Sequence, residues 1–354
     1  MRPPPRPLRR VLLPVDVALL VVLVGVFGAA TVLGALLTPF GRRRRPLRIA
    51  AFALAYCAME LVVLARLGGL WWVRVARRPF RAMSAEQWQA GNERLLASAL
   101  SLVLRAGRRC FGFEVVVDHP AGARLAGGPL AADPLSGGAP VLVLARHGGP
   151  GDSFALVHLL LTRYHRQARV VLKDVLQFDP ALDLLLNRLR SCFLPSPSGT
   201  GEDLTDRLRK VVAGLGPQGA LLLFPEGGNW TPTRHRRAIR RLRRDHHDEA
   251  ARSAALMDNV LPPRPGGVLA CLDARPDLRV VIVAHAGLDR IVTLRQAWDQ
   301  LPLRTPMTVR LWPAVRPPED PDDRLAWLTT EWAVVDEWID AHRAGQTGKV
   351  AGDS

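Results

Sequence analysis

Residues 141–154, VLVLARHGGPGDSF, form the stretch of sequence that predicts the fold most directly. Its first five residues are apolar, which is typical of a strand buried on both faces of a parallel sheet. A glycine-rich turn follows, and a helical pattern then begins at Asp152. A buried strand that leads into a helix through a tight turn is characteristic of an α/β domain.

Similar apolar runs recur along the chain and alternate with helical patterns. The predicted strands are 113–117, 141–145, 169–172, 220–224, 280–284 and 307–312. This alternation predicts an α/β fold, with a largely parallel central sheet flanked by helices and preceded by N-terminal membrane helices.

Several helix boundaries are also predicted from local signals. Ser84 and Gln87 have the spacing of a capping box, so we expect a helix to begin there and to end at Gly107. A cap residue followed by a first-turn proline predicts further helix starts at 179–180, 231–232 and 320–321.

Residues 1–80 are predicted to form a membrane anchor region. The run 17–37 contains only apolar residues, Gly and Thr, and a bilayer needs about 20 such residues. It exceeds the ~7–15 apolar residues of a signal peptide and leads into a basic cluster, so we expect it to be retained. A weaker run, 49–64, contains Glu60 and precedes Trp71 and Trp72. The region therefore predicts one or two transmembrane or interfacial helices.

The rest of the chain is predicted to hold a catalytic domain at 81–345 and a disordered tail at 346–354, with a flexible Gly- and Pro-rich loop at 121–140. The formal net charge of +16 indicates an anionic partner, such as a membrane surface. Four scattered cysteines favour neither a disulfide framework nor a zinc site. We therefore expect a membrane location, with the catalytic domain facing the cytosol.

His147 and Asp152 are the candidate catalytic pair. Both follow the strand at 141–145, and α/β folds place their sites at the carboxyl ends of parallel strands. An imidazole can accept a hydroxyl proton near neutral pH, and a carboxylate can orient the ring and stabilise its charged form. With nine histidines in the chain, one H-x-x-x-x-D pattern arises by chance about half the time. Position after a buried strand therefore counts for more than the pattern itself.

A second candidate constellation is residues 220–232, ALLLFPEGGNWTP. Here another buried strand ends in a turn that holds Glu226, Gly227 and Gly228. The backbone N–H groups of such a turn, together with the following helix N-terminus, are suited to a phosphate or to the oxyanion of a tetrahedral intermediate. The alternative is a solvated turn with an incidental Glu, to which turn statistics give about one chance in four.

The two motifs in this order, H-x-x-x-x-D at 147–152 and FPEG at 224–227, resemble the glycerolipid acyltransferase family, the 1-acylglycerol-3-phosphate acyltransferases. The block VLKD at 171–174 is similar to the family's substrate-binding block, and VLPPRPGG at 260–267 is similar to a segment of its lysocardiolipin acyltransferase-type branch. The resemblance spans roughly residues 85–300.

This resemblance implies an O-acyltransferase of phospholipid biosynthesis that moves an acyl group from acyl-CoA or acyl carrier protein to a lysophospholipid such as 1-acylglycerol-3-phosphate. It needs no cofactor. His147 is then the general base and Asp152 its orienting partner. Glu226 and Gly227, with the adjacent Gly228, help to hold the glycerol-phosphate group. The remaining candidates for phosphate contact are Lys173 and Arg264.

The sequence departs from the family pattern at three places. Arg146 stands where the family usually has Asn, and 227–229 reads Gly-Gly-Asn where Gly-Thr-Arg is usual. The arginine often found between the two motifs is absent from 192–196. These departures concern the choice of acceptor more than acyl transfer itself.

Two other functions remain open alternatives. A lipid hydrolase could use the same His and Asp, but neither G-x-S-x-G nor a papain-like cysteine context is present. A membrane-tethered nucleic-acid binder could use the basic run 234–247, yet the sequence has no recognisable nucleic-acid fold, so no nucleic acid is expected as a partner. The adjacent pair His246 and His247 lacks metal-site spacing, and no metal is expected. His285, also at a strand end, either faces the same cleft or is a near-surface histidine, and the second case is the more common one.

Overall fold

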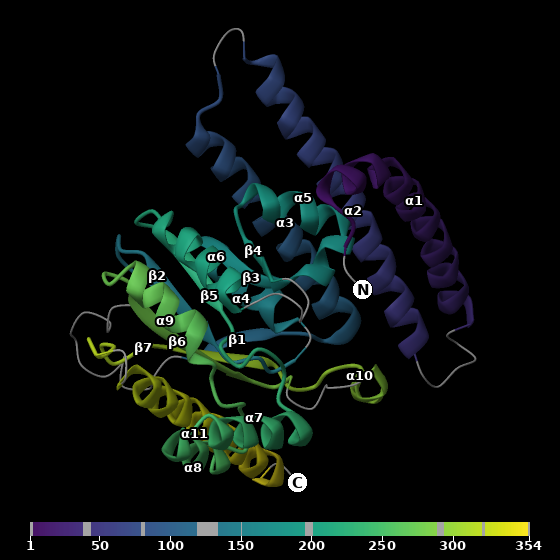
Figure 1. Cartoon of the computed structure of the whole chain (residues 1–354). Coiled ribbons are helices and arrows are strands. Elements are labelled where there is room, and N and C mark those ends of the chain that lie inside the picture. The colour runs from purple at the N-terminus through teal and green to yellow at the C-terminus, as the bar shows by residue number, and fades with distance from the viewer. Residues whose placement is uncertain are drawn as a thin grey trace, which may run out of the picture.

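In a computed structural model, the described part of the chain folds around one mixed β-sheet of seven strands (Figure 1). The structure describes residues 3–37, 44–78, 82–118, 134–149, 151–194, 201–288, 294–320 and 323–352. The strand order is β1-β7-β6-β2-β5-β3-β4, and only β6 and β7 pair antiparallel. The strands are β1 (Val115–Asp118), β2 (Val141–Ala145), β3 (Gln167–Lys173), β4 (Cys192–Leu194), β5 (Gly219–Leu223), β6 (Arg279–Ala286) and β7 (Met307–Pro313). The predicted α/β class with a largely parallel sheet is thus confirmed.

All six predicted strands are present, with ends that differ from the predicted ones by two residues at most. The prediction missed β4, which has only three residues and pairs with β3 at the edge of the sheet. Such a short segment carries no periodic signal.

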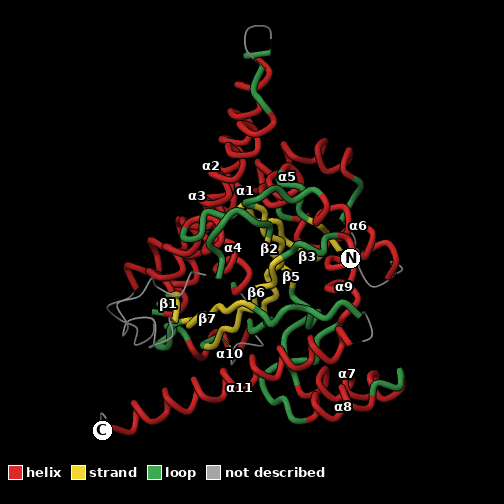
Figure 2. The backbone as a smooth tube through the Cα atoms, turned by 90° about the vertical axis from the view of Figure 1, so that its left-hand side faces the viewer, coloured by secondary structure: helices red, strands yellow, loops and turns green. Residues whose placement is uncertain are grey.

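Helices cover both faces of the sheet, as Figure 2 shows for α3 and α4 on one side and α11 on the other. Val141 and Val143 pack with α2 (Arg45–Ala76), α3, α4 and α5, whereas Leu142 and Leu144 pack with α6, α9 and α11. Burial on both faces explains why β2 reads as a continuous apolar run. The helices after the N-terminal pair are α3 (Ala85–Phe111), α4 (Asp152–Thr162), the 3₁₀ helix η3 (Asp174–Phe178), α5 (Pro180–Arg188), α6 (Gly201–Ala213), α7 (Pro232–Arg244), α8 (Asp248–Ala255), α9 (Pro265–Ala274), α10 (Leu294–Gln300) and α11 (Asp323–Gly352).

The capping box at the start of α3 is confirmed, since Gln87 N donates to Ser84 Oγ and Ser84 N donates to Gln87 Oε1, both at 3.1 Å. The predicted helix end at Gly107 is wrong. The helix continues to Phe111 and ends at Gly112, whose φ of +73° suits a residue without a Cβ. Gly107 is buried within the helix instead.

Two of the three predicted cap-and-proline starts are also confirmed. Asp179 accepts a hydrogen bond from Leu182 N at the start of α5, and Thr231 accepts one from Arg234 N at the start of α7. The third pair, 320–321, extends outside the described residues, as does most of the predicted loop 121–140. Residues 346–352 of the predicted tail belong to α11, and 353–354 lie outside the described residues.

The N-terminal region forms two helices, α1 (Arg6–Leu37) and α2 (Arg45–Ala76), each long and apolar enough to cross a membrane. They are not separate from the α/β domain, because Met59, Val63 and Leu67 of α2 are part of the same core as β2. Both ends of the pair contact the domain. Arg9 forms an ion pair with Asp183 of α5 at 3.1 Å, and Arg45 Nε donates to Leu301 O at 3.0 Å.

Candidate functional site

The carboxyl end of β2 brings the predicted catalytic pair together. His147 Nδ1 lies 2.7 Å from Asp152 Oδ2, and Gly151, with a φ of +91°, allows the turn between them. Because a carboxylate only accepts hydrogen bonds, Nδ1 is the nitrogen that donates, and in the neutral imidazole the lone pair is therefore on Nε2. The His147 side chain is 23% exposed. The imidazole is therefore oriented as a base with access to a ligand.

Asp152 is held from several sides at the first turn of α4. Its Oδ2 also accepts from Gly148 N at 3.0 Å and Gly149 N at 3.3 Å, and its Oδ1 accepts from Ser153 N at 2.6 Å. Burial raises the pKa of this carboxyl group, but the hydrogen bond from His147, the neighbouring His285 and the backbone bonds outweigh it and lower the pKa to about 2. Asp152 is therefore a fixed anion at neutral pH.

His285 lies directly behind this pair, at the end of the neighbouring strand β6. It is fully buried, so the expectation of a near-surface position is wrong. Its Nε2 is 3.0 Å from Arg146 O and 3.7 Å from Asp152 Oδ2. The sheet order explains this position, because β6 pairs with β2 along their length.

Arg146, which stands where the resembled family has Asn, points into the protein. It is 1% exposed, and its guanidinium donates to His285 O at 2.8 Å and to Asn259 O at 2.9 Å. This arginine thus ties β2 to β6 and to the segment before α9, and it is not placed for direct contact with a ligand.

Glu226 follows β5, the other neighbour of β2, and lies under the site. Its side chain is buried, with Oε1 accepting from His147 N at 3.3 Å and Oε2 accepting from Leu261 N at 3.2 Å. Burial raises the pKa of Glu226 to about 7, although nearby Arg146 and the two backbone bonds act in the opposite direction. The carboxylate of Glu226 therefore braces the backbone of His147 and the 260–264 segment.

Gly227 and Gly228 form the next part of the site, and two arginines cover them. Gly227 has a φ of +69°, and a Cβ there would lie 3.1 Å from Arg264 Cζ. A Cβ at Gly228 would lie 3.3 Å from Arg234 Nη1. Arg264 N also donates to Pro225 O at 2.9 Å. The glycines thus leave room for guanidinium groups from two separate segments.

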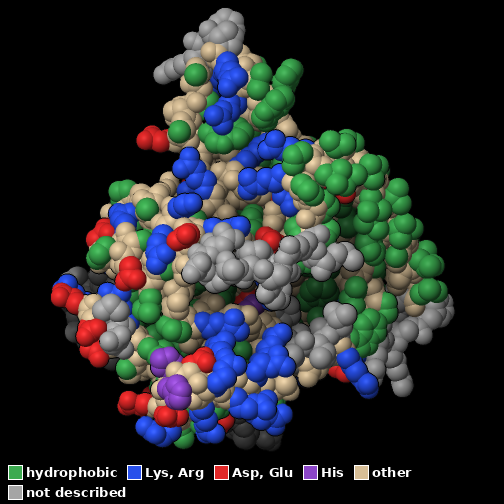
Figure 3. Space-filling model, in the orientation of Figure 1, with side chains coloured by type: hydrophobic (Ala, Val, Ile, Leu, Met, Phe, Trp, Pro, Cys, Tyr) green, Lys and Arg blue, Asp and Glu red, His purple; other side chains and the backbone are tan. Residues whose placement is uncertain are grey.

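This arginine cluster is larger than the sequence analysis indicated. Partial burial lowers the pKa of Arg264, and the positive charge of Arg241 lowers it further. Arg234 and Arg241 both belong to α7, and Figure 3 shows basic side chains gathered over α7 beside a hollow in this face. The signal for them was the basic run 234–247, but its arginines occupy every side of the helix except the apolar one with Ile239 and Leu242, so the sequence could not show which ones face the Gly-Gly turn.

Lys173, the remaining predicted residue, lies at the end of β3 and is exposed. β3 is separated from β2 by β5. The side chain of Lys173 makes no hydrogen bond or ion pair with another residue that the structure describes, so it is not joined to the pair His147 and Asp152.

Within the described part of the chain, no group of three or more His, Cys, Asp or Glu side chains is arranged to hold a metal ion. The chain was also compared with known proteins, and no family model, curated protein or solved structure matches it.

Proposed function

We propose that this protein is a membrane-associated acyltransferase that moves a fatty acyl group from acyl-CoA or acyl carrier protein to the hydroxyl of a lysophospholipid. The observation that carries the proposal is the bond between His147 Nδ1 and Asp152 Oδ2, 2.7 Å long, at the end of a buried central strand. It leaves Nε2 as a base, which is the group that acyl transfer to an alcohol requires.

In the proposed reaction, Nε2 of His147 takes the proton of the acceptor hydroxyl as the oxygen attacks the thioester carbonyl. The tetrahedral intermediate then collapses, the carbon–sulfur bond breaks, and the thiolate leaves with the proton from the imidazolium. Asp152, ionised at neutral pH, stabilises the imidazolium between these steps. No covalent acyl-enzyme is formed.

The arginine cluster supports an acceptor that carries a phosphate. Arg264 and Arg234 lie against the Gly227–Gly228 turn, and a guanidinium can donate two parallel hydrogen bonds to phosphate oxygens. The resembled family has an arginine at the position of Asn229, in its Gly-Thr-Arg segment. In the proposed function, Arg264 and Arg234 supply the positive charge that this missing arginine would have given.

A hydrolase is the second candidate, and the site geometry disfavours it. A serine hydrolase needs its nucleophile hydrogen-bonded to the base. Among the described residues, no Ser or Cys side chain is bonded to His147, and the nearby Ser153 Oγ donates to Asp152 Oδ1 at 3.0 Å instead. A nucleic-acid binder would leave the hydrogen-bonded pair of His147 and Asp152 without a role.

The membrane location is proposed to be interfacial. If a helix crosses the bilayer, at least one of its ends lies far from a domain that stays on one side of the membrane. The helix pair formed by α1 and α2 instead contacts the domain at both of its ends, through Arg9 at one end and Arg45 at the other. The outer surface of α1 exposes a long series of apolar side chains, which include Val11, Val15 and Val22. The pair is therefore suited to lie in one leaflet on the cytosolic side.

The test is acceptor-dependent release of CoA. We expect the purified protein in detergent to release CoA from acyl-CoA only when a lysophospholipid is present, and His147→Ala to lose this activity while it stays folded. Release that does not depend on the acceptor would favour hydrolysis, and unchanged transfer by His147→Ala would refute the mechanism.

A second measurement addresses the phosphate. Arg264→Gln should raise KM for a lysophospholipid phosphate about tenfold and leave KM for monoacylglycerol unchanged, because one charge-assisted bond contributes roughly 1.5–3 kcal/mol. Arg236→Gln, an exposed arginine on α7, serves as the control. An equal effect on both acceptors would contradict a phosphate contact.

A further inference from the structure

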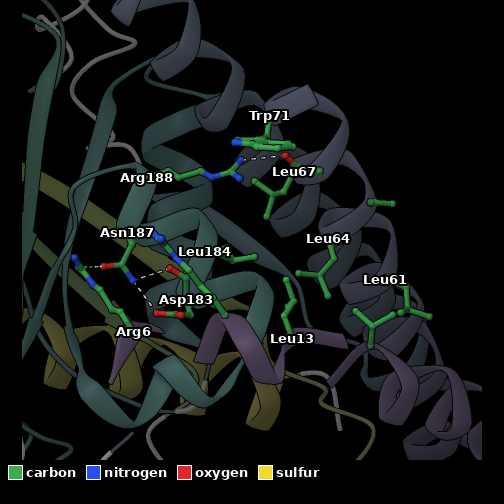
Figure 4. Close-up of a pocket in the computed structure, with 14 residues that line it drawn as sticks. Arg6, Leu13, Leu61, Leu64, Leu67, Trp71, Asp183, Leu184, Asn187 and Arg188 are labelled. Carbon is green, nitrogen blue, oxygen red and sulfur yellow. Dashed lines mark hydrogen bonds between the residues drawn. The ribbon is translucent and has the colours of Figure 1, made fainter. Parts of the chain in front are cut away.

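A groove of about 880 Å³ lies between α1, α2 and α5, and it shares no residue with the site around His147. Its volume is within the range of ligand-binding pockets, about 300–1,000 Å³. Figure 4 shows that Arg6, Asp183 and Asn187 lie on one side of it, whereas Leu13 and Leu64 lie on the other. The full lining is Arg6, Arg10, Leu13, Val17, Leu61, Leu64, Ala65, Leu67, Gly68, Trp71, Asp183, Leu184, Asn187 and Arg188. The groove is therefore amphipathic.

The polar side carries excess positive charge. Arg6, Arg10 and Arg188 line it, and Asp183 is its acidic residue. The carboxylate of Asp183 already has partners, since it pairs with Arg9 at 3.1 Å and accepts from Asn187 Nδ2 at 2.7 Å. The positive charges of Arg6 and Arg10 act on the Asp183 carboxyl group as well, so one carboxylate is shared among three arginines and the groove keeps a net positive charge.

The side chain of Arg10 is exposed, and it makes no hydrogen bond or ion pair with any residue that the structure describes. Arg188 donates to Leu67 O at 3.1 Å and lies over the ring of Trp88. Burial lowers the pKa of Arg188, and the positive charges of Arg10 and Arg74 lower it further. An anion placed between Arg10 and Arg188 would relieve this repulsion.

The apolar side belongs to the helices that are suited to a membrane. Leu13 and Val17 come from α1, and Leu61 and Leu64 come from α2. Trp71, which also lines the groove, is 51% exposed, and tryptophan is the residue type enriched at the level of lipid headgroups. The groove is thus apolar along the helices and basic where the helices reach the domain.

We propose that the groove binds one phospholipid with an anionic headgroup, with its phosphate between Arg10 and Arg188 and one acyl chain along Leu64. Such a lipid would link α1 to α5 and hold the helix pair on the domain. This inference rests on membrane association, and it is independent of acyl transfer, so the two can fail separately.

Native mass spectrometry of the delipidated full chain in detergent tests the proposal. We expect one phosphatidylglycerol to bind at least fivefold more tightly than phosphatidylcholine with the same chains, and glycerol phosphate, which lacks the chains, not to be retained. Arg10→Gln should weaken binding of phosphatidylglycerol about fivefold, the equivalent of roughly 1 kcal/mol for one basic residue. Arg236→Gln, which removes an exposed arginine of α7, should have no effect.

Leu64→Trp provides a second variant that leaves every charge in place. It should reduce retention of phosphatidylglycerol by filling the apolar side, with thermal unfolding compared to confirm that the fold is kept. Equal retention of the two lipids would overturn the proposal, as would equal binding of glycerol phosphate. An Arg10→Gln variant that behaves like Arg236→Gln, together with an unaffected Leu64→Trp, would overturn it as well.

Discussion

Replacement of Asp152 by Asn is the sharpest test of the site, because it removes a charge and almost no volume. The lowering of the Asp152 pKa from 3.8 to about 2 corresponds to about 2 kcal/mol of stability at pH 7. Since the pKa in the folded state is the lower one, this contribution is present above pH 3.8 and is lost as the pH falls through about 2. Asp152→Asn should therefore unfold at a lower urea concentration at pH 7.

The geometry also predicts how the new amide is oriented. The amide oxygen of the new asparagine is expected to take the place of Oδ2, where it still accepts from His147 and from Gly148 N. The NH₂ group then takes the place of Oδ1, which in the wild type lies 2.6 Å from Ser153 N, so that two donors face one another there. His147 keeps its position but loses the anion that stabilises its protonated form. We expect acceptor-dependent CoA release to fall about 10³–10⁴-fold.

Ser153→Ala is the matched control, because it removes the Oγ bond to Asp152 Oδ1 and keeps the carboxylate. It should retain activity to within about tenfold, as expected for loss of one bond worth roughly 0.5–1.5 kcal/mol. Combining His147→Ala with Asp152→Asn should reduce activity no further than His147→Ala does, since the two residues act as a unit. A folded Asp152→Asn protein with activity within tenfold of wild type would refute the assigned role.

Three further changes test the surroundings. Glu226→Gln should remove a pH dependence of the free energy of unfolding. Because the pKa of Glu226 is raised to about 7, the stabilisation from its neutral form is fully present below pH 4.5 and falls by about 3 kcal/mol as the pH rises to 7. Urea unfolding should therefore show a free energy that changes less across this pH range in the variant than in the wild type. Gly227→Ala should destabilise the protein by about 1–3 kcal/mol and weaken acceptor binding, because the φ of Gly227 is +69° and the new Cβ would meet the guanidinium of Arg264. Gly266→Ala is the control, since a Cβ there has open space, and this variant should bind the acceptor normally. Leu67→Ala in α2 should lower the free energy of unfolding by about 2–5 kcal/mol, since Leu67 is 1% exposed, and a loss no larger than that of the exposed Val62→Ala would show that α2 is not part of the core.

Much of the fold could be predicted because its signals are local. The apolar run of β2 reflects burial on both faces, and the predicted bounds match the observed strand Val141–Ala145. The start of α3 was predictable from two residues that bond to one another. Its end was not, because Gly107 is compatible with a helix interior and the helix ends only at Gly112. The short strand β4 depends on β3 beside it, so no local signal predicts it.

The role of Glu226 illustrates what sequence alone could not determine. The motif indicated a group that holds the acceptor, whereas in the structure its carboxylate bonds His147 N and Leu261 N. Both partners are far from it along the chain: His147 becomes a neighbour because β2 and β5 pair in the sheet, and Leu261 becomes one because the segment before α9 packs beside the end of β5. Which side of a strand-end turn a carboxylate faces depends on such packing.

The sequence by itself determined that the candidate pair His147 and Asp152 lies together, because the two residues are five positions apart and a glycine turn suffices to join them. It also predicted that the first 80 residues contain a helix long and apolar enough to cross a membrane. Only the tertiary structure decided that His285 lies behind Asp152, that Arg264 and Arg234 meet at Gly227 and Gly228, and that α2 packs into the domain. The physical reason is the same in each case: these contacts join segments distant in sequence, and the order of the strands and the packing of helices on the sheet bring them together.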